Sequence, residues 1–440
     1  MTFDKGDIMP EDKKVDIVGR SNVEGANLFR DWFAELGDAA KNEKSAAYVF
    51  VMGSMAEILK VFDFPLVLPE ITSLQTAVRR VADEYLTVAE DYGYSPDICG
   101  YVKADIGIHL RERAHPMGKI PKPALAVLTN ACNTYVKWAE IWERMYNIPV
   151  FVLDVPATRQ AGGQFQLGSS DFTRDCKYVE AQIRELITLC EKVSGKKFDI
   201  DRLRETMAYA NDMNIGWKRV LELNKSRPSL FNALTDGTVY LGVSNNFRGT
   251  KEGSQYFKNL VEEMEYKAAH GIGTQTDEKY RLAFVGVPCY PIFRRFNEMF
   301  AEWGGAFVHS TYLHFASGGA NIGFEYDVSR PIESLAEGTL ISVREAMDNM
   351  FHQDRVLIKM VKDYELDGVI YHPIKSCRTV STGLADGRRA MMAATDTPSL
   401  FIESDMMDKR VVSEAQMKNR ADAFFEGLAS RRLTAAAKTT

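Results

Sequence analysis

The sequence has few cysteines, and none of them shows the paired spacing of a zinc or redox site. Six cysteines are spread over 440 residues, and no Cys-x-x-Cys motif occurs. A zinc ribbon or a thioredoxin-like site would normally contain such a pair, so neither class is indicated. The irregular spacing also does not indicate a disulfide framework, because such frameworks belong to small secreted chains.

Several other sequence features are missing, and each absence argues against a further class of protein. No stretch approaches the roughly 18 apolar residues that span a bilayer, and the polar N-terminus lacks the apolar core of a secretory signal. No Gly-x-x-x-x-Gly-Lys-Ser/Thr phosphate loop is present. The formal net charge of -6 gives no general attraction to nucleic acid or anionic lipid. We therefore expect a cytoplasmic protein that binds neither nucleic acid nor membranes.

The chain is long enough for several domains, since 440 residues exceed the size at which one hydrophobic core usually stops growing. Strand-like and helix-like segments alternate in two regions, which predicts parallel sheets covered by helices. The fold class is therefore α/β, with two flavodoxin-like or Rossmann-like parallel-sheet domains. We expect a helical N-terminal arm at 1–44, the first α/β domain at 45–171, a helical connection at 172–272, the second α/β domain at 273–429 and a flexible tail at 430–440.

The expected elements follow from hydrophobic periodicity. Strands are predicted at 47–52, 65–69, 124–128, 149–154, 280–288, 305–310, 368–371 and 398–403. Helices are predicted at 54–62, 74–91, 134–146, 178–193, 203–223, 292–303 and 414–429. The helix at 203–223 begins after a plausible cap at Asp199 or Asp201.

Three cysteines lie where a ligand site is expected. Cys132 and Cys377 each follow a predicted strand, and Cys99 opens a predicted helix after a turn. In open α/β sheets, ligands bind beyond the carboxyl ends of the strands, and a helix N-terminus lowers the pKa of a thiol. Three thiolates from two domains would hold one iron-sulfur cluster in the cleft between the domains. The alternative is simple packing, because free cysteine is often buried, and the residues alone leave both open.

The remaining cysteines have a different context. Cys176 and Cys190 lie on the predicted helical connection, where packing is the expected role. Cys289 follows a predicted strand and is therefore the candidate for a fourth thiolate.

Six segments resemble the 2-hydroxyacyl-CoA dehydratase and benzoyl-CoA reductase superfamily, over about residues 45 to 425. They are Ser95 to Gly107, Thr129-Asn130-Ala131-Cys132-Asn133, Leu153-Asp154-Val155-Pro156, Thr274-Gln275-Thr276-Asp277-Glu278-Lys279-Tyr280-Arg281, Lys375-Ser376-Cys377 and Phe401-Ile402-Glu403-Ser404-Asp405. Within the superfamily, the chain looks most like the larger cluster-bearing subunit of ATP-dependent, class I benzoyl-CoA reductases. Cys289-Tyr290 stands in a stretch associated with Asn-Trp, which leaves the acyl group open.

The resemblance implies a chemistry and a set of partners. It implies a 4Fe-4S cluster held by Cys99, Cys132 and Cys377, with an open position on the fourth iron, and a two-electron reduction of benzoyl-CoA to a cyclic dienoyl-CoA in anaerobic aromatic degradation. The implied partners are a smaller homologous cluster-bearing subunit, ATP-hydrolysing activase subunits, and a low-potential electron donor such as ferredoxin. The missing phosphate loop agrees with ATP being handled by another chain.

Proton donors are expected near the cysteines, because general acids act within hydrogen-bond reach. His372, Glu403 and Asp405 are the candidates, since they lie near Cys377 or end a predicted strand. The alternatives are a core histidine and two helix-capping carboxylates.

Substrate-binding candidates form a second group. Thr274, Thr276 and Arg281, with Asp277 and Glu278, would either orient the thioester or hold the two domains together. Ser376, beside Cys377, is a further candidate. Arginines that would either meet the CoA phosphates or remain solvated at the surface are Arg294, Arg295, Arg388 and Arg389.

Two other functions remain open at this stage. A 2-hydroxyacyl-CoA dehydratase subunit would use a similar cluster but regain its electron after eliminating water. An electron-relay subunit would carry a cluster that never touches the substrate.

Overall fold

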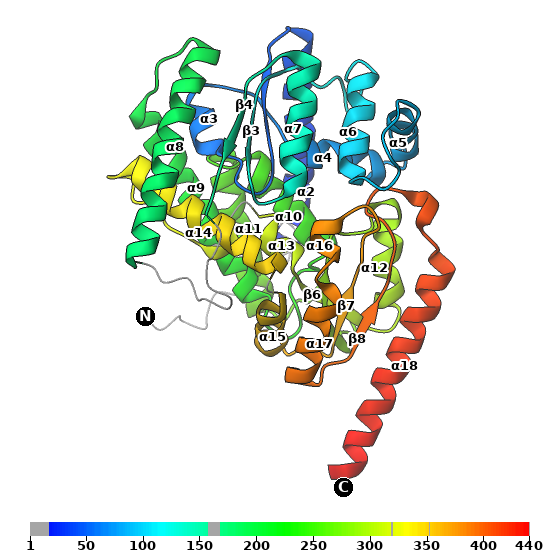
Figure 1. Ribbon diagram of the computed structural model, residues 1–440. Coiled ribbons are helices and arrows are strands. Elements are labelled where there is room, and N and C mark those ends of the chain that lie inside the picture. The colour runs from blue at the N-terminus through cyan, green and yellow to red at the C-terminus, as the bar shows by residue number, and fades with distance from the viewer. Residues whose placement is uncertain (1–16, 157–167, 318–319, 352, 440) are drawn as a thin grey trace.

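The protein is built around two parallel sheets, one above the other in Figure 1. The computed structural model describes residues 17–156, 168–317, 320–351 and 353–439. Each sheet has four strands, and every strand pair is parallel. Within these described ranges, no helix is both long and apolar enough to cross a membrane.

The first sheet has the strand order β2-β1-β3-β4. Its strands are β1 (Ala46–Val49), β2 (Leu66–Val67), β3 (Pro123–Thr129) and β4 (Val150–Leu153). Tyr48 pairs with Val67 on one side and with Ala126 on the other, so β1 is an inner strand. All four residues of β1 are buried, as expected for a parallel strand covered on both faces.

The second sheet repeats this arrangement with the order β6-β5-β7-β8. Its strands are β5 (Tyr280–Val285), β6 (Gly305–Ser310), β7 (Gly368–Tyr371) and β8 (Ser399–Phe401). In each sheet the first strand in the chain lies between the second and the third, which is the flavodoxin-like order. The predicted fold class is confirmed.

The helices of the first half cover the first sheet. They are α2 (Arg20–Lys41), α3 (Ala56–Val61), α4 (Pro69–Val78), α5 (Ala82–Asp91), α6 (Gly100–Leu110) and α7 (Asn133–Tyr146). The single helix expected at 74–91 was wrong, because the chain turns between α4 and α5. Arg80 has a left-handed backbone with φ of 62°, and this turn allows α5 to pack against α6.

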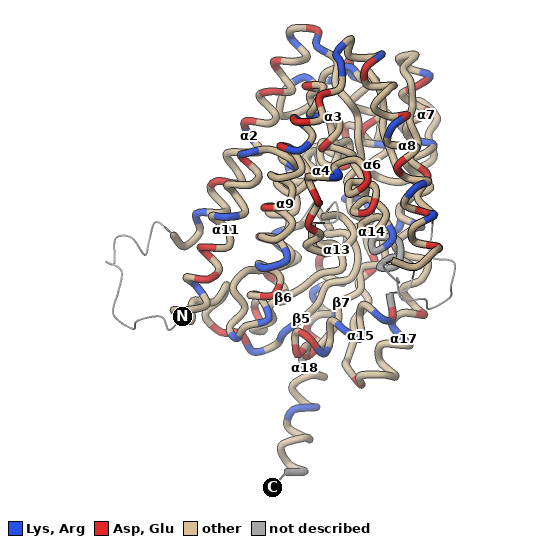
Figure 2. The backbone as a smooth tube through the Cα atoms, turned by 90° about the vertical axis from the view of Figure 1, so that its left-hand side faces the viewer, with Lys and Arg blue, Asp and Glu red and all other residues tan. Residues whose placement is uncertain are grey.

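Four helices make up the middle of the chain. They are α8 (Ser170–Ser194), α9 (Ile200–Leu223), α10 (Thr235–Asn246) and α11 (Lys251–Ala269). The predicted cap of α9 is confirmed at Asp199, whose side chain accepts from the backbone N–H groups of Asp201 and Arg202. The N-terminal helix α2 packs on α10 and α11, and α9 packs on α11. Basic and acidic residues are mixed along this flank (Figure 2).

The second half carries the remaining helices. They are α12 (Phe293–Ala301), α13 (Tyr312–Phe315), α14 (Pro331–Phe351), α15 (Gln353–Asp363), α16 (Arg378–Ser381), α17 (Leu384–Thr395) and α18 (Glu414–Thr439), with 3-10 turns η1 (Tyr290–Ile292), η2 (Ala320–Ile322) and η3 (Lys409–Val411). The expected end of the last helix at Ala429 was wrong, since α18 continues through most of the segment predicted as a tail.

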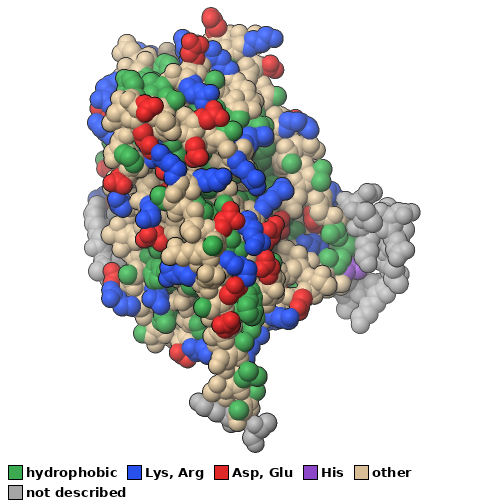
Figure 3. Space-filling model, turned by 90° about the vertical axis from the view of Figure 1, so that its right-hand side faces the viewer, with side chains coloured by type: hydrophobic (Ala, Val, Ile, Leu, Met, Phe, Trp, Pro, Cys, Tyr) green, Lys and Arg blue, Asp and Glu red, His purple; other side chains and the backbone are tan. Residues whose placement is uncertain are grey.

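The last helix projects away from the body of the molecule (Figure 1). Met417, Ala421 and Phe425 are buried and hold its first turns against the second half. Leu433, further along, is 73% exposed. Figure 3 shows the same projection in a space-filling view, with charged side chains of both signs interspersed over that face.

Candidate functional site

Each of the three predicted ligand cysteines opens a helix. Cys99 is the N-cap residue of α6, Cys132 of α7 and Cys377 of α16. Cys132 follows β3 and Cys377 follows β7, and these strands occupy the same place in the two sheets. The topology therefore brings two thiols to equivalent carboxyl-end loops of the two halves.

The three cysteines line one cavity of about 70 Å³, together with Glu70, Tyr101, Tyr135 and other residues of both halves. Across this cavity the two halves touch. The hydroxyl of Thr379, on α16, lies 3.8 Å from Cys132 Sγ and donates a hydrogen bond of 3.1 Å to Asn133 Oδ1. Segments more than 240 residues apart in the chain thus meet at the thiols.

Burial controls the protonation of these thiols. It raises the pKa of Cys99 well above its ordinary value, with a further increase from the neighbouring Cys377 and Cys132. Burial also raises the pKa of Cys132, and that of Cys377 to about 11. The expected lowering by the helix N-termini was therefore wrong for the protein without a bound cation, because desolvation outweighs the backbone N–H groups.

A short polar frame holds the loops of Cys99 and Cys377 together. The Gly100 N–H donates to Ser376 Oγ over 3.2 Å, and the Ser376 N–H donates to Asp405 Oδ2 over 2.9 Å. The other carboxylate oxygen of Asp405 accepts from the Met407 N–H at 2.8 Å and the Asp408 N–H at 3.0 Å. Ser376 and Asp405, which the sequence suggested for substrate binding and catalysis, are thus placed between the two thiol loops.

The helices that carry Cys99 and Cys132 are joined by a buried carboxylate. Asp105, on α6, accepts hydrogen bonds of 2.8 Å from the indole N–H groups of Trp138 and Trp142, both on α7. Asp105 is 2% exposed, and Trp138 also lines the thiol cavity. This contact joins the middle of α6 to the middle of α7 beside the cavity.

Glu70 is a buried carboxyl group in the cavity wall that the sequence analysis missed. It accepts a hydrogen bond from the Val51 N–H at 3.0 Å and another from the Tyr135 hydroxyl. Burial raises the pKa of Glu70 to about 7, although both hydrogen bonds oppose that rise. Its position directly after β2, at the carboxyl edge of the sheet, was the available signal.

A larger apolar chamber of about 470 Å³ adjoins the thiol cavity. Side chains from α2, α4, α10 and η1 form it, and among the described lining residues only Arg30 and Arg79 are charged. Val51, Tyr312 and Ala316 line both spaces and so form the wall between them. The arrangement offers an apolar group a place within reach of the thiols.

Comparison with known proteins identifies the family. Residues 52–428 match the family described as 2-hydroxyglutaryl-CoA dehydratase, D-component. This chain belongs to that family. The matched range contains all three thiols and Glu70, and the predicted superfamily resemblance is confirmed.

Individual relatives span nearly the same length. A benzoyl-CoA reductase subunit of Thauera aromatica is 35% identical, over 95% of this chain and 97% of its own. The (R)-2-hydroxyisocaproyl-CoA dehydratase alpha subunit of Clostridioides difficile is 26% identical, and the (R)-phenyllactyl-CoA dehydratase alpha subunit of Clostridium sporogenes is 25% identical, each over 86% of this chain and 88% of its own. Each relative is named as one subunit of an enzyme that acts on a CoA thioester.

Within this dehydratase-family chain, His372 and Glu403 lie apart from the thiol cavity. The His372 ring is fully buried, with Nδ1 2.6 Å from the Val287 carbonyl and Nε2 2.6 Å from Ser404 Oγ. Burial lowers the pKa of His372 to about 4, so the ring is neutral near pH 7. Glu403 is largely exposed and pairs with Lys375 at 3.0 Å. Their suggested proton-donor roles remain predictions.

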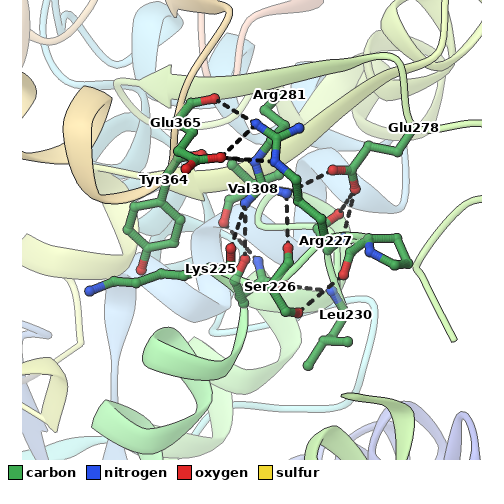
Figure 4. A network of polar contacts seen from close by, with 12 residues as sticks. Lys225, Ser226, Arg227, Leu230, Glu278, Arg281, Val308, Tyr364 and Glu365 are labelled. Atoms are coloured by element: carbon green, nitrogen blue, oxygen red, sulfur yellow. Dashed lines mark hydrogen bonds and ion pairs between the residues drawn. The ribbon is translucent and has the colours of Figure 1, made fainter. Parts of the chain in front are cut away.

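Arg281, near the start of β5, lies in a polar network (Figure 4). Its guanidinium is 1% exposed, pairs with Glu278 at 2.7 Å and donates to backbone carbonyls of the segment after α9. The Thr274 N–H donates to the Ser229 carbonyl at 2.7 Å, and Thr276 is exposed. These contacts join the segment after α9 to the second sheet. Both suggested roles, thioester binding and holding the two domains together, stay predictions for Thr274, Thr276 and Arg281.

The other three cysteines lie outside the described lining of the thiol cavity, and three of the four candidate arginines have partners close by. Cys190 is buried within α8, and Cys176 is partly buried on the same helix. Cys289 is 1% exposed and lies outside the described lining of the thiol cavity. Arg295 pairs with Glu302 at 2.9 Å, Arg388 donates to Ser399 Oγ at 2.6 Å, and Arg389 pairs with Asp386.

The type of donor is compatible with an iron-sulfur cluster. Over the described ranges, no three histidine, cysteine, aspartate or glutamate side chains are placed to hold one metal ion. Cys99, Cys132 and Cys377 line a shared space from three segments. Thiolates are ligands for iron-sulfur clusters, as they are for zinc and copper(I), so the chemistry of the three side chains fits a cluster.

Proposed function

We propose that this chain is the iron-sulfur subunit of an ATP-dependent benzoyl-CoA reductase, with a 4Fe-4S cluster bound by Cys99, Cys132 and Cys377. The observation that carries the proposal is the meeting of three thiols from both halves in one cavity beside an apolar chamber. The 35% identity to a benzoyl-CoA reductase subunit supports this choice among the family's reactions.

The cluster would supply single electrons at low potential, with an iron position left free by the three-thiolate set. This chain's own residues would do the rest. The hydrogen bonds among Gly100, Ser376 and Asp405 would hold Cys99 and Cys377 in position relative to each other. The hydrogen bonds from α7 to Asp105 would hold Cys132 in position.

The apolar chamber is the proposed site of the aromatic acyl group. A phenyl ring is uncharged, and most of the chamber lining is apolar. Arg30 and Arg79 lie among its lining residues, and guanidinium groups are suited to the phosphates of CoA. The shared wall at Val51, Tyr312 and Ala316 would bring the acyl group and its thioester close to the thiols.

Glu70 is the proposed proton source in the cavity wall. Reduction of the ring adds two electrons and two protons, so a proton must arrive where water has little access. A carboxyl group with a pKa near 7 carries a proton about half of the time at neutral pH and can release it. Its hydrogen bonds with the Tyr135 hydroxyl and the Val51 N–H hold it in the cavity wall.

The proposed partners follow from what this chain contains. A low-potential donor such as ferredoxin would supply electrons through an ATP-hydrolysing activase, since no phosphate loop occurs in this sequence. A smaller homologous subunit is expected to complete the enzyme, because the relatives are named as single subunits.

A 2-hydroxyacyl-CoA dehydratase subunit is the second candidate, since relatives at 25–26% identity carry that name. The number of electrons consumed per substrate molecule distinguishes the reductase from the dehydratase. A reductase consumes two electrons for each benzoyl-CoA, whereas a dehydratase uses electrons only catalytically with a 2-hydroxyacyl-CoA. A complex that binds benzoyl-CoA only on its partner subunit would instead indicate an electron relay.

The cluster assignment is tested with anaerobically purified complex. Iron and acid-labile sulfide are quantified and EPR spectra are recorded for the wild type, Cys377→Ala and Cys176→Ala. We expect Cys377→Ala to lose iron or change its spectrum and Cys176→Ala to match the wild type, because Cys176 lies on α8 away from the cavity. A full, unchanged cluster in Cys377→Ala would reject the ligand assignment.

A further inference from the structure

Three tyrosines meet at the wall between the thiol cavity and the apolar chamber. Tyr101 lines the cavity, Tyr290 lines the chamber, and Tyr312 lines both. The hydroxyls of Tyr290 and Tyr312 are 3.1 Å apart and hydrogen-bonded, and Tyr101 lies beside both. They come from α6 in the first half and from η1 and α13 in the second, so the group exists only where the halves meet.

One of these hydroxyls is poorly satisfied. Tyr101, Tyr290 and Tyr312 are 7%, 1% and 8% exposed, and the buried Tyr101 hydroxyl lies close to the other two hydroxyls but makes no well-formed hydrogen bond in the described part of the chain. A buried hydroxyl without a well-formed hydrogen bond costs free energy. The cost is removed when a ligand brings an acceptor into the cavity.

The chemistry of an acyl-CoA identifies that acceptor. An aromatic or aliphatic acyl chain offers no strong acceptor, and CoA phosphates require cationic partners. Of the described residues that line the thiol cavity, none is Lys or Arg. The thioester carbonyl oxygen is the neutral acceptor nearest the acyl chain, because the amide carbonyls of CoA lie further along its arm.

We propose that Tyr101 and Tyr312 donate hydrogen bonds to the thioester carbonyl oxygen of the substrate, with Tyr290 holding Tyr312 in place. This inference rests on the proposed function and names the groups that orient its substrate. An electron added to the acyl group increases the negative charge on the carbonyl oxygen. Fixed donors in a dry site then stabilise the reduced state more than the neutral one.

The direct test is infrared difference spectroscopy of benzoyl-CoA labelled with carbon-13 at the thioester carbonyl. The label is bound to the oxidised complex without reductant, so no turnover occurs. In the wild type we expect the carbonyl stretch to shift to lower frequency than in an aprotic solvent. Tyr101→Phe and Tyr312→Phe should each move the band back toward higher frequency, because each removes one donor while keeping the ring.

Tyr371→Phe is the matched control, since its hydroxyl is also buried and unpartnered but lies on β7 outside the described lining of both spaces. Its band should match the wild type. A bound band that stays unchanged in Tyr101→Phe and Tyr312→Phe would overturn this inference alone. Absence of any bound band in the wild type would overturn the proposed function, and this inference with it.

Kinetics provide a second measurement. In steady-state reduction, each of the two variants should lower kcat by about tenfold or more, in line with loss of one donor to a developing oxyanion. KM should change less, because the donors act mainly on the reduced state. An unchanged kcat in both variants would contradict the proposal even if they bind substrate normally.

Discussion

At the scale of single residues, Gly100 has no side chain, and this allows two of the loops around the thiols to lie close to each other. A Cβ atom at Gly100 would lie 2.8 Å from Met407 Cβ and 3.3 Å from Asp405 Oδ1. Glycine at this position therefore allows the start of α6 to contact the loop after β8. Cys99 is its immediate neighbour and takes its place from the same contact.

Gly100→Ala should destabilise the protein by about 1–3 kcal/mol, because the added methyl group overpacks a buried contact. It should also lower the iron content of anaerobically purified complex. Gly37→Ala is the control, since nothing lies within 4 Å of its Cβ position on α2. The control should be neutral or stabilising by up to about 1 kcal/mol. Urea midpoints of both variants test this, and equal midpoints would contradict the packing argument.

Glu70 should make stability depend on pH. Its pKa is raised from 4.5 to about 7 in the folded protein, so the unfolded chain binds fewer protons between these values. The contribution of Glu70 to stability should therefore be largest below about pH 4.5, fall as the pH rises, and level off above about 7, a total loss of roughly 3 kcal/mol. Glu70→Gln should remove this loss, because the amide stays neutral and Tyr135 can accept as well as donate.

The measurement is the difference in unfolding free energy between Glu70→Gln and wild type at pH 5 and pH 8. Relative to the wild type, Glu70→Gln should have a higher unfolding free energy at pH 8 than at pH 5. Tyr135→Phe removes a hydrogen bond that lowers the pKa of Glu70. The pKa should therefore rise further, and the unfolding free energy should depend more strongly on pH. A difference that stays constant between the two pH values would refute the assigned pKa.

At the scale of elements, the sequence predicted the strands well and the helix boundaries less well. The strand at 368–371 matches β7, and the strands at 124–128 and 305–310 lie within or coincide with β3 and β6, because buried apolar runs bounded by turns mark them clearly. The turn between α4 and α5 was missed because the apolar spacing continues through Arg79 and Arg80, while tertiary packing on α6 decides the break.

The thiol site was predictable only in part for a similar reason. The three cysteines could be found because each follows a recognisable strand or turn. Tyr312 could not, and Glu70 offered only its place after β2 as a signal, because their importance depends on which distant segment covers them. Asp405 could be found from its place after a strand. That its carboxylate accepts hydrogen bonds from three backbone N–H groups could not be predicted, because those groups come together only in the folded loops.

Asp105→Ala tests whether the α6–α7 contact supports the thiols. Loss of the carboxylate leaves two buried indole N–H groups without an acceptor, which should cost about 2–5 kcal/mol. The variant should also bind less iron than wild type. Asp97→Ala, in the exposed loop before Cys99, should change stability by no more than about 0.5 kcal/mol. Comparable losses in both variants, measured by urea unfolding, would show that the contact is not specific.

At the scale of the whole molecule, two similar sheets are joined through buried charges and not through the thiol loops alone. Arg281 connects the second sheet with the segment after α9, through Glu278 and several backbone carbonyls (Figure 4). On the other side, Arg248 pairs with Glu57 at 2.7 Å and links the middle helices to α3. The middle helices therefore bind both halves.

Arg281→Met should destabilise the protein by about 3–5 kcal/mol, because it leaves the buried Glu278 carboxylate without its partner. Arg295→Met is the matched control, since that arginine pairs with Glu298 and Glu302 on the surface, and it should cost about 1 kcal/mol or less. Thermal unfolding of the two variants distinguishes these outcomes. Equal melting temperatures would show that the Arg281 network does not stabilise the contact between the second sheet and the middle helices.

The pairing of Cys132 with a segment near Thr379 also has a consequence for biosynthesis. Thr379 lies 247 residues after Cys132, so a ribosome adding 5–20 residues per second needs about 12–50 s between them. During that interval Cys99 and Cys132 exist without Cys377, the third ligand of the proposed cluster. If the proposed cluster is correct, it would be completed only after most of the chain has been translated, and the two earlier cysteines would face any oxidant present in the meantime.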